Sequence, residues 1–187
     1  VNNQIIYAAD DNVLIEDCKI RNNTSTRNSF IYLSNSKINR CQITDNTVSS
    51  NVIESYNSKA KISNCLICNN TCPESYRTIY IYGGVSMINC TVARNVTKNA
   101  NVIYMYNSTL KNSIIVGNTT NSNYSNILAK EGTNTIQNNM FEGTFVDGNI
   151  DGSMTFAAFT DAENGDYSLS ANSYCINAGE DVADSLD

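Results

Sequence analysis

One short pattern, I-x-x-C-x-I-x-x-N-T, recurs along this chain and constrains its fold more than any other feature of the sequence. A cysteine returns at steps of 23 to 25 residues, with serine in the fifth copy, to give the column Cys18, Cys41, Cys65, Cys90 and Ser113. An asparagine stands five residues later in each copy, at Asn23, Asn46, Asn70, Asn95 and Asn118. A repeat of this length buries its apolar face only by stacking on its neighbours, so the chain is predicted to be a solenoid.

Each copy contains a second segment in which apolar residues alternate with others. These segments align on one isoleucine each, at Ile31, Ile53, Ile79, Ile103 and Ile127. Short alternating runs of β-branched and aromatic residues indicate strands, and few segments show the apolar period of a helix. We therefore predict an all-β chain, a single-stranded right-handed parallel β-helix of about six coils of about 22–26 residues. A leucine-rich repeat is disfavoured because leucine is scarce and both halves of each copy indicate strands.

Stacking at one inter-strand spacing, about 4.8 Å, would place equivalent residues of successive coils above one another. The aliphatic and cysteine columns then point inward, where a free thiol behaves as a small apolar residue. The asparagine column falls at a bend, where an amide can bond to the backbone and to the next amide. We expect both columns to be structural ladders.

The last quarter of the chain departs from the repeat. Gly148 and Gly152 interrupt it, and the segment EGTFVDGNIDGS indicates turns. We therefore place the coils in residues 1–141 and expect residues 142–187 to form a loop-rich cap of the same domain. An uncapped stack would expose strand edges, so this cap is predicted to pack on the end of the solenoid.

Seven cysteines and no histidine limit the chemistry that the chain can perform. Serine–histidine and cysteine–histidine nucleophiles are excluded. Cys68 follows inward Ile67 and should face outward, while Cys72 lies just past the bend. A local disulfide between them and two free thiols both fit this spacing. We expect no metal site and no cofactor, because the C-x3-C pair stands alone.

The charge is sparse, with 12 basic and 18 acidic residues and a net charge of −6. A nucleic-acid partner is not expected, since it would require a basic face. No apolar run is long enough to span a bilayer. A polysaccharide lyase needs a basic proton abstractor and a glycoside hydrolase needs two carboxyl groups across the scissile bond. The outward charged residues are interpreted instead as surface ion pairs, which Asp17 could form with Arg40 and Asp45 with Arg21.

Tyrosines gather in two outward columns of the second strand of each coil. Glu54 interrupts the first column, and the six tyrosines are Tyr32, Tyr80 and Tyr104 in one column and Tyr56, Tyr82 and Tyr106 in the other. Such a face could bind an extended glycan or an extracellular protein partner. Stacked tyrosines could equally serve only to shield the sheet. Both interpretations remain open at this point.

The coil pattern resembles the repeats of bacterial β-helix surface proteins, including chlamydial polymorphic outer-membrane proteins. The tail resembles the end of the choice-of-anchor Q family, in which a G-D-Y/F-x-L segment precedes an S-P-A-I-D-A-G-like motif. The matching residues are Gly165, Asp166, Tyr167, Leu169, Ser173, Ile176, Ala178 and Gly179, whereas Tyr174, Cys175 and Asn177 depart from the motif. The resemblance implies a secreted or bacterial cell-surface protein, with its signal and anchor outside this sequence.

These observations favour a monomeric, non-catalytic extracellular module for adhesion or for binding a glycan or protein. The alternative is a polysaccharide lyase or glycoside hydrolase of the pectate-lyase-like type, or its inactive remnant. Whether the chain is an enzyme stays open, although none of its residues indicates a catalytic site.

Overall fold

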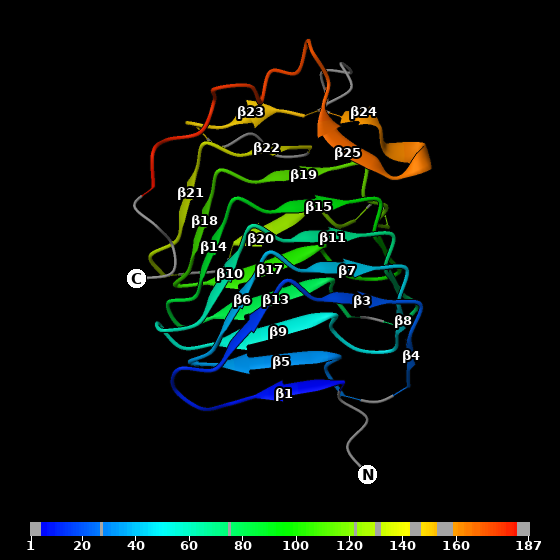
Figure 1. Ribbon diagram of the computed structural model, residues 1–187, viewed down its shortest axis with the longest axis vertical. Coiled ribbons are helices and arrows are strands. Elements are labelled where there is room, and N and C mark those ends of the chain that lie inside the picture. The colour runs from blue at the N-terminus through cyan, green and yellow to red at the C-terminus, as the bar shows by residue number, and fades with distance from the viewer. Residues whose placement is uncertain are drawn as a thin grey trace.

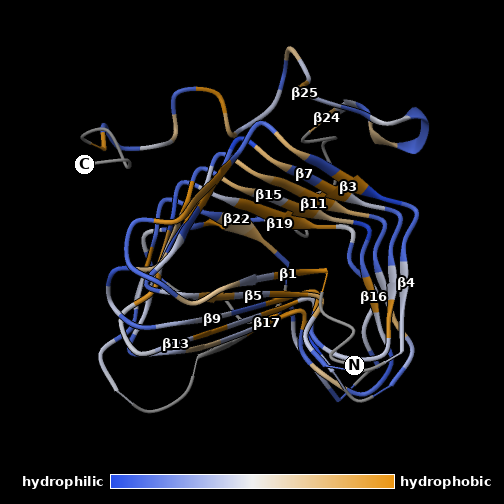
Figure 2. Ribbon diagram, turned by 60° about the horizontal axis from the view of Figure 1, so that its bottom comes forward, coloured by the Kyte–Doolittle hydropathy of each residue, from blue (hydrophilic) through white to orange (hydrophobic). Residues whose placement is uncertain are grey.

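The computed structural model describes residues 5–26, 28–74, 76–121, 123–129, 132–142, 147–152 and 159–182. It is a right-handed parallel β-solenoid whose short strands stack into four walls around one apolar core (Figures 1 and 2). The only helical element in the described ranges is a single 3-10 turn, η1 (Ala162–Asn164). No helix in these ranges has the length and apolar character needed to cross a bilayer. The predicted fold class is confirmed.

The first two walls are six-stranded parallel sheets. Sheet 1 contains β1 (Ile6–Ala8), β5 (Ile31–Ser34), β9 (Ile53–Tyr56), β13 (Ile79–Tyr82), β17 (Ile103–Tyr106) and β20 (Ile127–Ala129). Sheet 2 contains β2 (Leu14–Glu16), β6 (Lys37–Asn39), β10 (Lys61–Ser63), β14 (Ser86–Ile88), β18 (Thr109–Lys111) and β21 (Thr135–Gln137).

The other two walls complete each coil, and an antiparallel hairpin follows them. Sheet 3 has seven strands, β3 (Lys19–Arg21), β7 (Gln42–Thr44), β11 (Leu66–Cys68), β15 (Thr91–Ala93), β19 (Ile114–Val116), β22 (Met140–Phe141) and β23 (Ile150–Asp151). Sheet 4 has four, β4 (Thr24–Ser25), β8 (Thr47–Val48), β12 (Thr71–Cys72) and β16 (Val96–Thr97). The hairpin consists of β24 (Phe159–Asp161) and β25 (Asp166–Leu169).

Strand pairing keeps the repeat in the vertical register that its sequence predicts. Ile31 pairs with Ile53, which pairs with Ile79, and this column continues through Ile103 to Ile127. Strands of two to four residues have little stability alone, so their stability comes from the apolar area buried between coils. Inward side chains with no exposed surface include Leu33, Ile38, Ile43, Ile62, Ile67, Ile81 and Met87.

Two corners of each coil require a residue in the left-handed backbone region. The corner between sheets 2 and 3 has φ between 49° and 57° at Asp17, Arg40, Asn64, Asn89, Asn112 and Asn138. The corner between sheets 3 and 4 has φ between 55° and 65° at Asn22, Asp45, Asn69, Arg94 and Gly117. Asparagine and glycine enter this region at lower cost than other residues. The corners therefore give a second reason, beside the ladder, for the abundance of asparagine.

The C-terminal segment lies beside sheet 3 as well as at its end. β23 pairs with β22 and so adds one strand to the sheet. Phe159 of the hairpin packs in a cluster with Cys68, Ala93 and Met140, all on the outward face of sheet 3. In Figure 2 the hairpin lies outside this wall, not across the open end of the tube. The sequence predicts a cap on the end, whereas the described contacts of the hairpin are lateral.

The reason for this lateral packing is visible in the outward residues of sheet 3. Its first strands carry polar outward side chains, Lys19, Arg21, Gln42 and Thr44. Its later strands carry mostly apolar ones, Leu66, Cys68, Ala93, Ile114, Val116 and Met140. An apolar patch of this kind gains free energy when it is removed from water, and the hairpin provides that cover.

Candidate functional site

The tyrosine surface is the outward face of sheet 1, formed by Tyr7, Tyr32, Tyr56, Tyr80, Tyr82, Tyr104 and Tyr106. Pairing brings Tyr80 beside Tyr104 and Tyr82 beside both Tyr56 and Tyr106, as the sequence columns predict. Tyr7 extends the surface by one coil, since β1 pairs with β5 and places its ring against Tyr32. The alignment of Ile6 with Ile31 is the sequence signal that identifies Tyr7.

The rings of this surface stack on one another along the solenoid axis. The centroids of Tyr80 and Tyr104 lie 4.7 Å apart with an interplanar angle of 3°. Tyr82 and Tyr106 repeat this geometry at 4.7 Å and 9°. Because ring faces in these pairs are turned toward each other, the surface offers mainly ring edges and phenol hydroxyls. These pairs therefore do not form a platform of open ring faces.

Glu54 occupies a tyrosine position at the centre of the surface. Its carboxylate accepts hydrogen bonds from the Tyr56 hydroxyl and, at 3.4 Å, from the Asn51 side-chain nitrogen. Burial of the ring, the bond to Glu54 and the charge of Glu54 together raise the pKa of Tyr56. A phenol with a raised pKa is a poor general base at neutral pH. This pair therefore acts as a fixed polar centre of the surface.

Arg77 adds a cation beside the rings. Its guanidinium carbon lies 5.0 Å from the ring centroid of Tyr104 and 5.9 Å from that of Tyr80. The backbone N–H of Arg77 donates to the Asn51 side-chain oxygen at 3.1 Å, which fixes the start of this segment. Within the described ranges its Nε atom is buried without a hydrogen-bond partner. The outward columns of the strand do not include Arg77, because it lies two residues before the aligned isoleucine, at the position that Asn51 and Asn101 occupy in the neighbouring coils.

The asparagine column forms a continuous hydrogen-bonded ladder. The side-chain oxygen of Asn70 accepts from the backbone N–H of Asn46 at 3.1 Å and from its amide nitrogen at 2.9 Å. The amide nitrogen of Asn70 donates to the Ile43 carbonyl at 2.8 Å and to the Asn95 side chain at 3.0 Å. The same bonds link Asn23 to Asn46 and Asn95 to Asn118. This column satisfies the polar groups of the bend and is structural.

The cysteine column forms a second polar ladder. The backbone N–H of Cys18 donates to the Cys41 sulfur at 3.4 Å, and the Cys41 thiol contacts the Ile15 carbonyl at 3.6 Å. In the later coils of the same column, acceptors of backbone N–H groups are Ser113, Asn139 and Asn149. The thiols therefore occupy positions that amides fill elsewhere, a role that treating them as small apolar residues did not include.

All seven cysteines carry free thiols, and they differ in exposure. Cys41, Cys65 and Cys90 are buried within the solenoid, whereas Cys18 in the first coil is exposed. Cys72 is buried in the solenoid core and Cys68 lies in the separate cluster under the hairpin. No bridge joins Cys68 and Cys72. Burial raises the pKa of Cys72 to about 12 and also raises that of Cys68.

This distribution predicts a simple pattern of thiol reactivity. With excess aromatic disulfide reagent at about pH 8, Cys18 should be labelled first in the folded protein, because reaction requires access as well as the thiolate. The buried thiols should be labelled only on unfolding. The Cys18→Ser variant should lose the fast phase, as measured by absorbance and peptide mass mapping. Rapid labelling of Cys65 in the folded variant would contradict the buried column.

The outward charges form an ion-pair group at the corner between sheets 2 and 3. Arg40 donates to both carboxylate oxygens of Asp17 at 2.9 Å and lies 3.1 Å from Glu16. The hydrogen bonds from Arg40 hold the pKa of Asp17 below its usual value. The structure places Asp45 and Arg94 at left-handed corner positions. Among the described residues, no three cysteine, aspartate or glutamate side chains gather in a manner suited to a metal ion.

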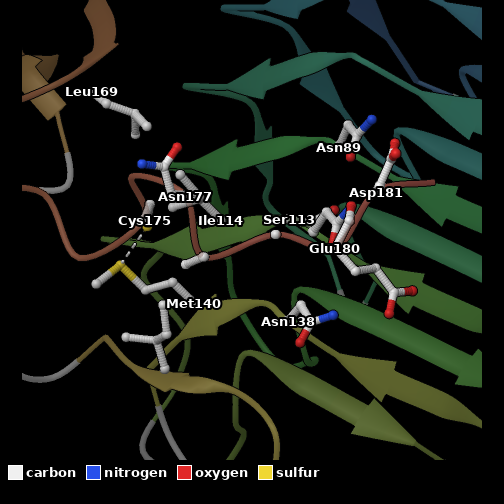
Figure 3. A pocket seen from close by; sticks show the side chains of 14 residues that line it. Asn89, Ser113, Ile114, Asn138, Met140, Leu169, Cys175, Asn177, Glu180 and Asp181 are labelled. Carbon is white, nitrogen blue, oxygen red and sulfur yellow. Dashed lines mark hydrogen bonds between the residues drawn. The ribbon is translucent and has the colours of Figure 1, made fainter.

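A cleft of about 400 Å³ lies between the corner of sheets 2 and 3 and the C-terminal segment (Figure 3). Its apolar lining consists of Ile114, Met140, Ile150, Leu169 and Cys175. Its polar lining includes Asn89, Asn112, Asn138, Asn177, Glu180 and Asp181. The Cys175 and Met140 sulfur atoms are 3.4 Å apart at its base. The sequence gives no indication of this cleft, because the tail and the coils meet only through the lateral packing.

Comparison with known proteins adds little to this geometry. No family model matches the chain, and no curated protein matches it either. One structure of a trypsin-treated form of QnrB1, a plasmid-mediated fluoroquinolone resistance protein, is 11% identical over 81% of this chain and 90% of that chain, with a TM-score of 0.23. A second trypsin-treated form of QnrB1 is 10% identical over 68% of this chain and 81% of that chain, with a TM-score of 0.17. Similarity this low carries no argument, so fold and site rest on the geometry above.

Proposed function

We propose that this chain is a non-catalytic β-solenoid module, secreted or displayed on a bacterial cell surface, that binds an extracellular partner through the tyrosine surface. The assignment to the cell surface rests on the resemblance of the coils and the tail to choice-of-anchor Q and related β-helix proteins. The assignment of binding rests on one observation, the ordered array of tyrosines with Arg77 and Glu54 on sheet 1.

A protein partner suits this surface better than a glycan. Tyrosine and arginine are the residues most enriched among the energetic centres of protein interfaces. The rings are held by their neighbours, with Tyr80 stacked on Tyr104, so little side-chain entropy remains to be lost on binding. A sugar ring would bind by stacking on an open aromatic face, but in the pairs Tyr80–Tyr104 and Tyr82–Tyr106 these faces cover each other. Phenol hydroxyls, Arg77 and Glu54 supply donors and acceptors that fix the orientation of a protein partner.

The test combines two substitutions at the centre of the surface. Tyr80→Ala with Tyr104→Ala should weaken binding of the partner by about 30-fold or more, since an aromatic centre of an interface contributes about 2 kcal/mol or more. A panel of purified extracellular proteins and a glycan array provide the ligands, and surface plasmon resonance measures the affinity. Tyr174→Ala is the matched control, because Tyr174 is an exposed tyrosine of the C-terminal segment, outside the surface.

The outcomes separate the alternatives. Binding to a protein that the double variant loses and Tyr174→Ala keeps supports the proposal. Glycan binding lost by the same variant would assign the surface to a carbohydrate. Binding that survives the double substitution would leave the tyrosines with a purely structural role in the sheet.

A further inference from the structure

The cleft beside the C-terminal segment has the chemistry of a small-molecule site. Its volume of about 400 Å³ lies within the range of ligand pockets. Half-buried Ile114 and Ile150 form an apolar base over buried Met140, and the exposed side chain of Leu169 contributes from β25. These residues come from three strands of sheet 3 and from the hairpin, so the site exists only when the hairpin is docked.

Three side-chain amides around this base have no hydrogen-bond partner among the described residues, namely those of Asn89, Asn138 and Asn177. Each carboxamide offers two donors and two acceptor lone pairs. All three residues have positive φ, between 55° and 57°, so their backbones are set by the corner or the turn and not by the amide. Asn89 and Asn177 are exposed and Asn138 is half-buried, so a ligand can bond to these amides by displacing water from them.

The wall of the cleft formed by the tail is fixed before any ligand binds. The Asn112 amide donates to the Glu180 carbonyl at 2.9 Å and accepts from the Glu180 N–H at 3.1 Å. Lys111 pairs with the Glu180 carboxylate. A side-chain carbon at Gly179 would lie 3.3 Å from Asn112, so this glycine permits the close approach of the tail. Such pre-organisation lowers the entropy cost of binding.

We infer that this cleft binds a neutral pyranose ring. A pyranose has an apolar C–H face, which suits the base, and a rim of hydroxyls, which suits amides that both donate and accept. The Glu180 and Asp181 carboxylates at the edge, together with a net charge of −6, disfavour anionic sugars. The site is distinct from the tyrosine surface and does not depend on it. The ring can belong to a free monosaccharide or to the end of a glycan, which share this chemistry.

The experiment titrates the protein with methyl glycosides of glucose, galactose, mannose and N-acetylglucosamine, and with methyl glucuronide as the charged analogue. Binding is followed by backbone amide chemical shifts in NMR spectra. At least one neutral glycoside should bind with a Kd on the order of millimolar, as ligands of this size do. The shifts should centre on residues 112–114 and 175–181. Oligosaccharides that end in the same ring should bind more tightly if the physiological ligand is a glycan.

Asn138→Gly with Asn177→Gly removes two amides and keeps the backbone, because glycine accepts the same positive φ. This variant should bind the glycoside about tenfold more weakly or not at all. Asn69→Gly is the matched control, since Asn69 has φ of 55° at a corner outside the cleft. Its binding should be unchanged.

The absence of shifts for every neutral glycoside at several times the expected Kd would overturn the inference. Equal binding by the double variant, or equal binding of methyl glucuronide, would do the same. Shifts confined to sheet 1 would also overturn it, because they would assign sugar binding to the tyrosine surface. Loss of the protein partner in the Tyr80 and Tyr104 variant has no bearing on this site.

Discussion

Replacing Asn70 by alanine is expected to lower the free energy of unfolding by about 3–5 kcal/mol, one of the largest single effects in the chain. Asn70 has no exposed surface and lies in the middle of the asparagine ladder. The substitution leaves the buried Asn46 N–H without its acceptor, and it also removes the amide bonds to the Ile43 carbonyl and the Asn95 side chain. Each buried unsatisfied polar group costs about 1–3 kcal/mol. Urea unfolding followed by circular dichroism measures the difference.

Asn23→Ala is the matched control for this prediction. Asn23 belongs to the same column but lies in the first coil, and its amide donates to the Arg21 carbonyl in an exposed position. Water can replace that bond, so the expected loss is about 1 kcal/mol or less. Equal losses for the two variants would show that the ladder stabilises the fold through something other than buried hydrogen bonds.

The coils could be predicted from the sequence because the same pattern of inward and corner residues occurs five times. A single Ile-x-x-Cys segment would be ambiguous, but its return at nearly constant spacing fixes the period, the inward face and the vertical register together. Ile38 pairs with Ile62, and Ile43 with Ile67, as alignment of the copies requires. The asparagine ladder followed from the same alignment, because an identical amide in each coil has an identical neighbour above it.

Features outside the repeat could not be predicted in this way. Arg77 precedes a strand and replaces the asparagine that stands at the same position in the neighbouring coils, at Asn51 and Asn101, so no conserved column of the strand identifies it. The size and polarity of cysteine predict a buried column. They do not predict the hydrogen bond from the Cys18 N–H to the Cys41 sulfur, which depends on how the Cys41 side chain is oriented. Ser113 at the same position was the available signal, since a hydroxyl in an inward column requires a hydrogen-bond partner.

Predicting where the tail packs requires information from two regions of the sequence at once. Once the inward positions of sheet 3 are assigned, Leu66 and Ile114 must point outward, and their apolar character is then unexplained without a cover. The sequence therefore indicates that these outward residues are covered, but it does not indicate which segment covers them. The outward apolar residues of sheet 3 provide a surface for the hairpin at the side of the tube, and Phe159 packs there beside Cys68 and Ala93.

Replacing Phe159 by alanine is therefore expected to release the hairpin from sheet 3 while the coils stay folded. Phe159 is only 6% exposed and packs edge-on against Tyr167, with ring centroids 5.2 Å apart. Truncation of a buried phenylalanine costs about 3–5 kcal/mol. Here we expect this loss to lower the free energy of docking the hairpin on sheet 3, and not the stability of the coils. In a Cys18→Ser background, labelling of Cys68 should accelerate by about 100-fold, since its cover opens more often. Peptide mass mapping identifies the labelled thiol.

Thr160→Ala provides the control, because Thr160 lies on the same strand with its side chain exposed and bonded to Ser168. In the Thr160→Ala variant, the labelling rate of Cys68 should match that of the Cys18→Ser parent. Cys72, buried in the solenoid core, should stay unreactive in both variants, which separates local opening of the hairpin from unfolding of the coils. Simultaneous labelling of Cys68 and Cys72 in Phe159→Ala would mean that hairpin and solenoid unfold as one cooperative unit. Unchanged labelling of Cys68 would mean that contacts other than Phe159, such as those of Asn112 with Glu180, hold the C-terminal segment in place.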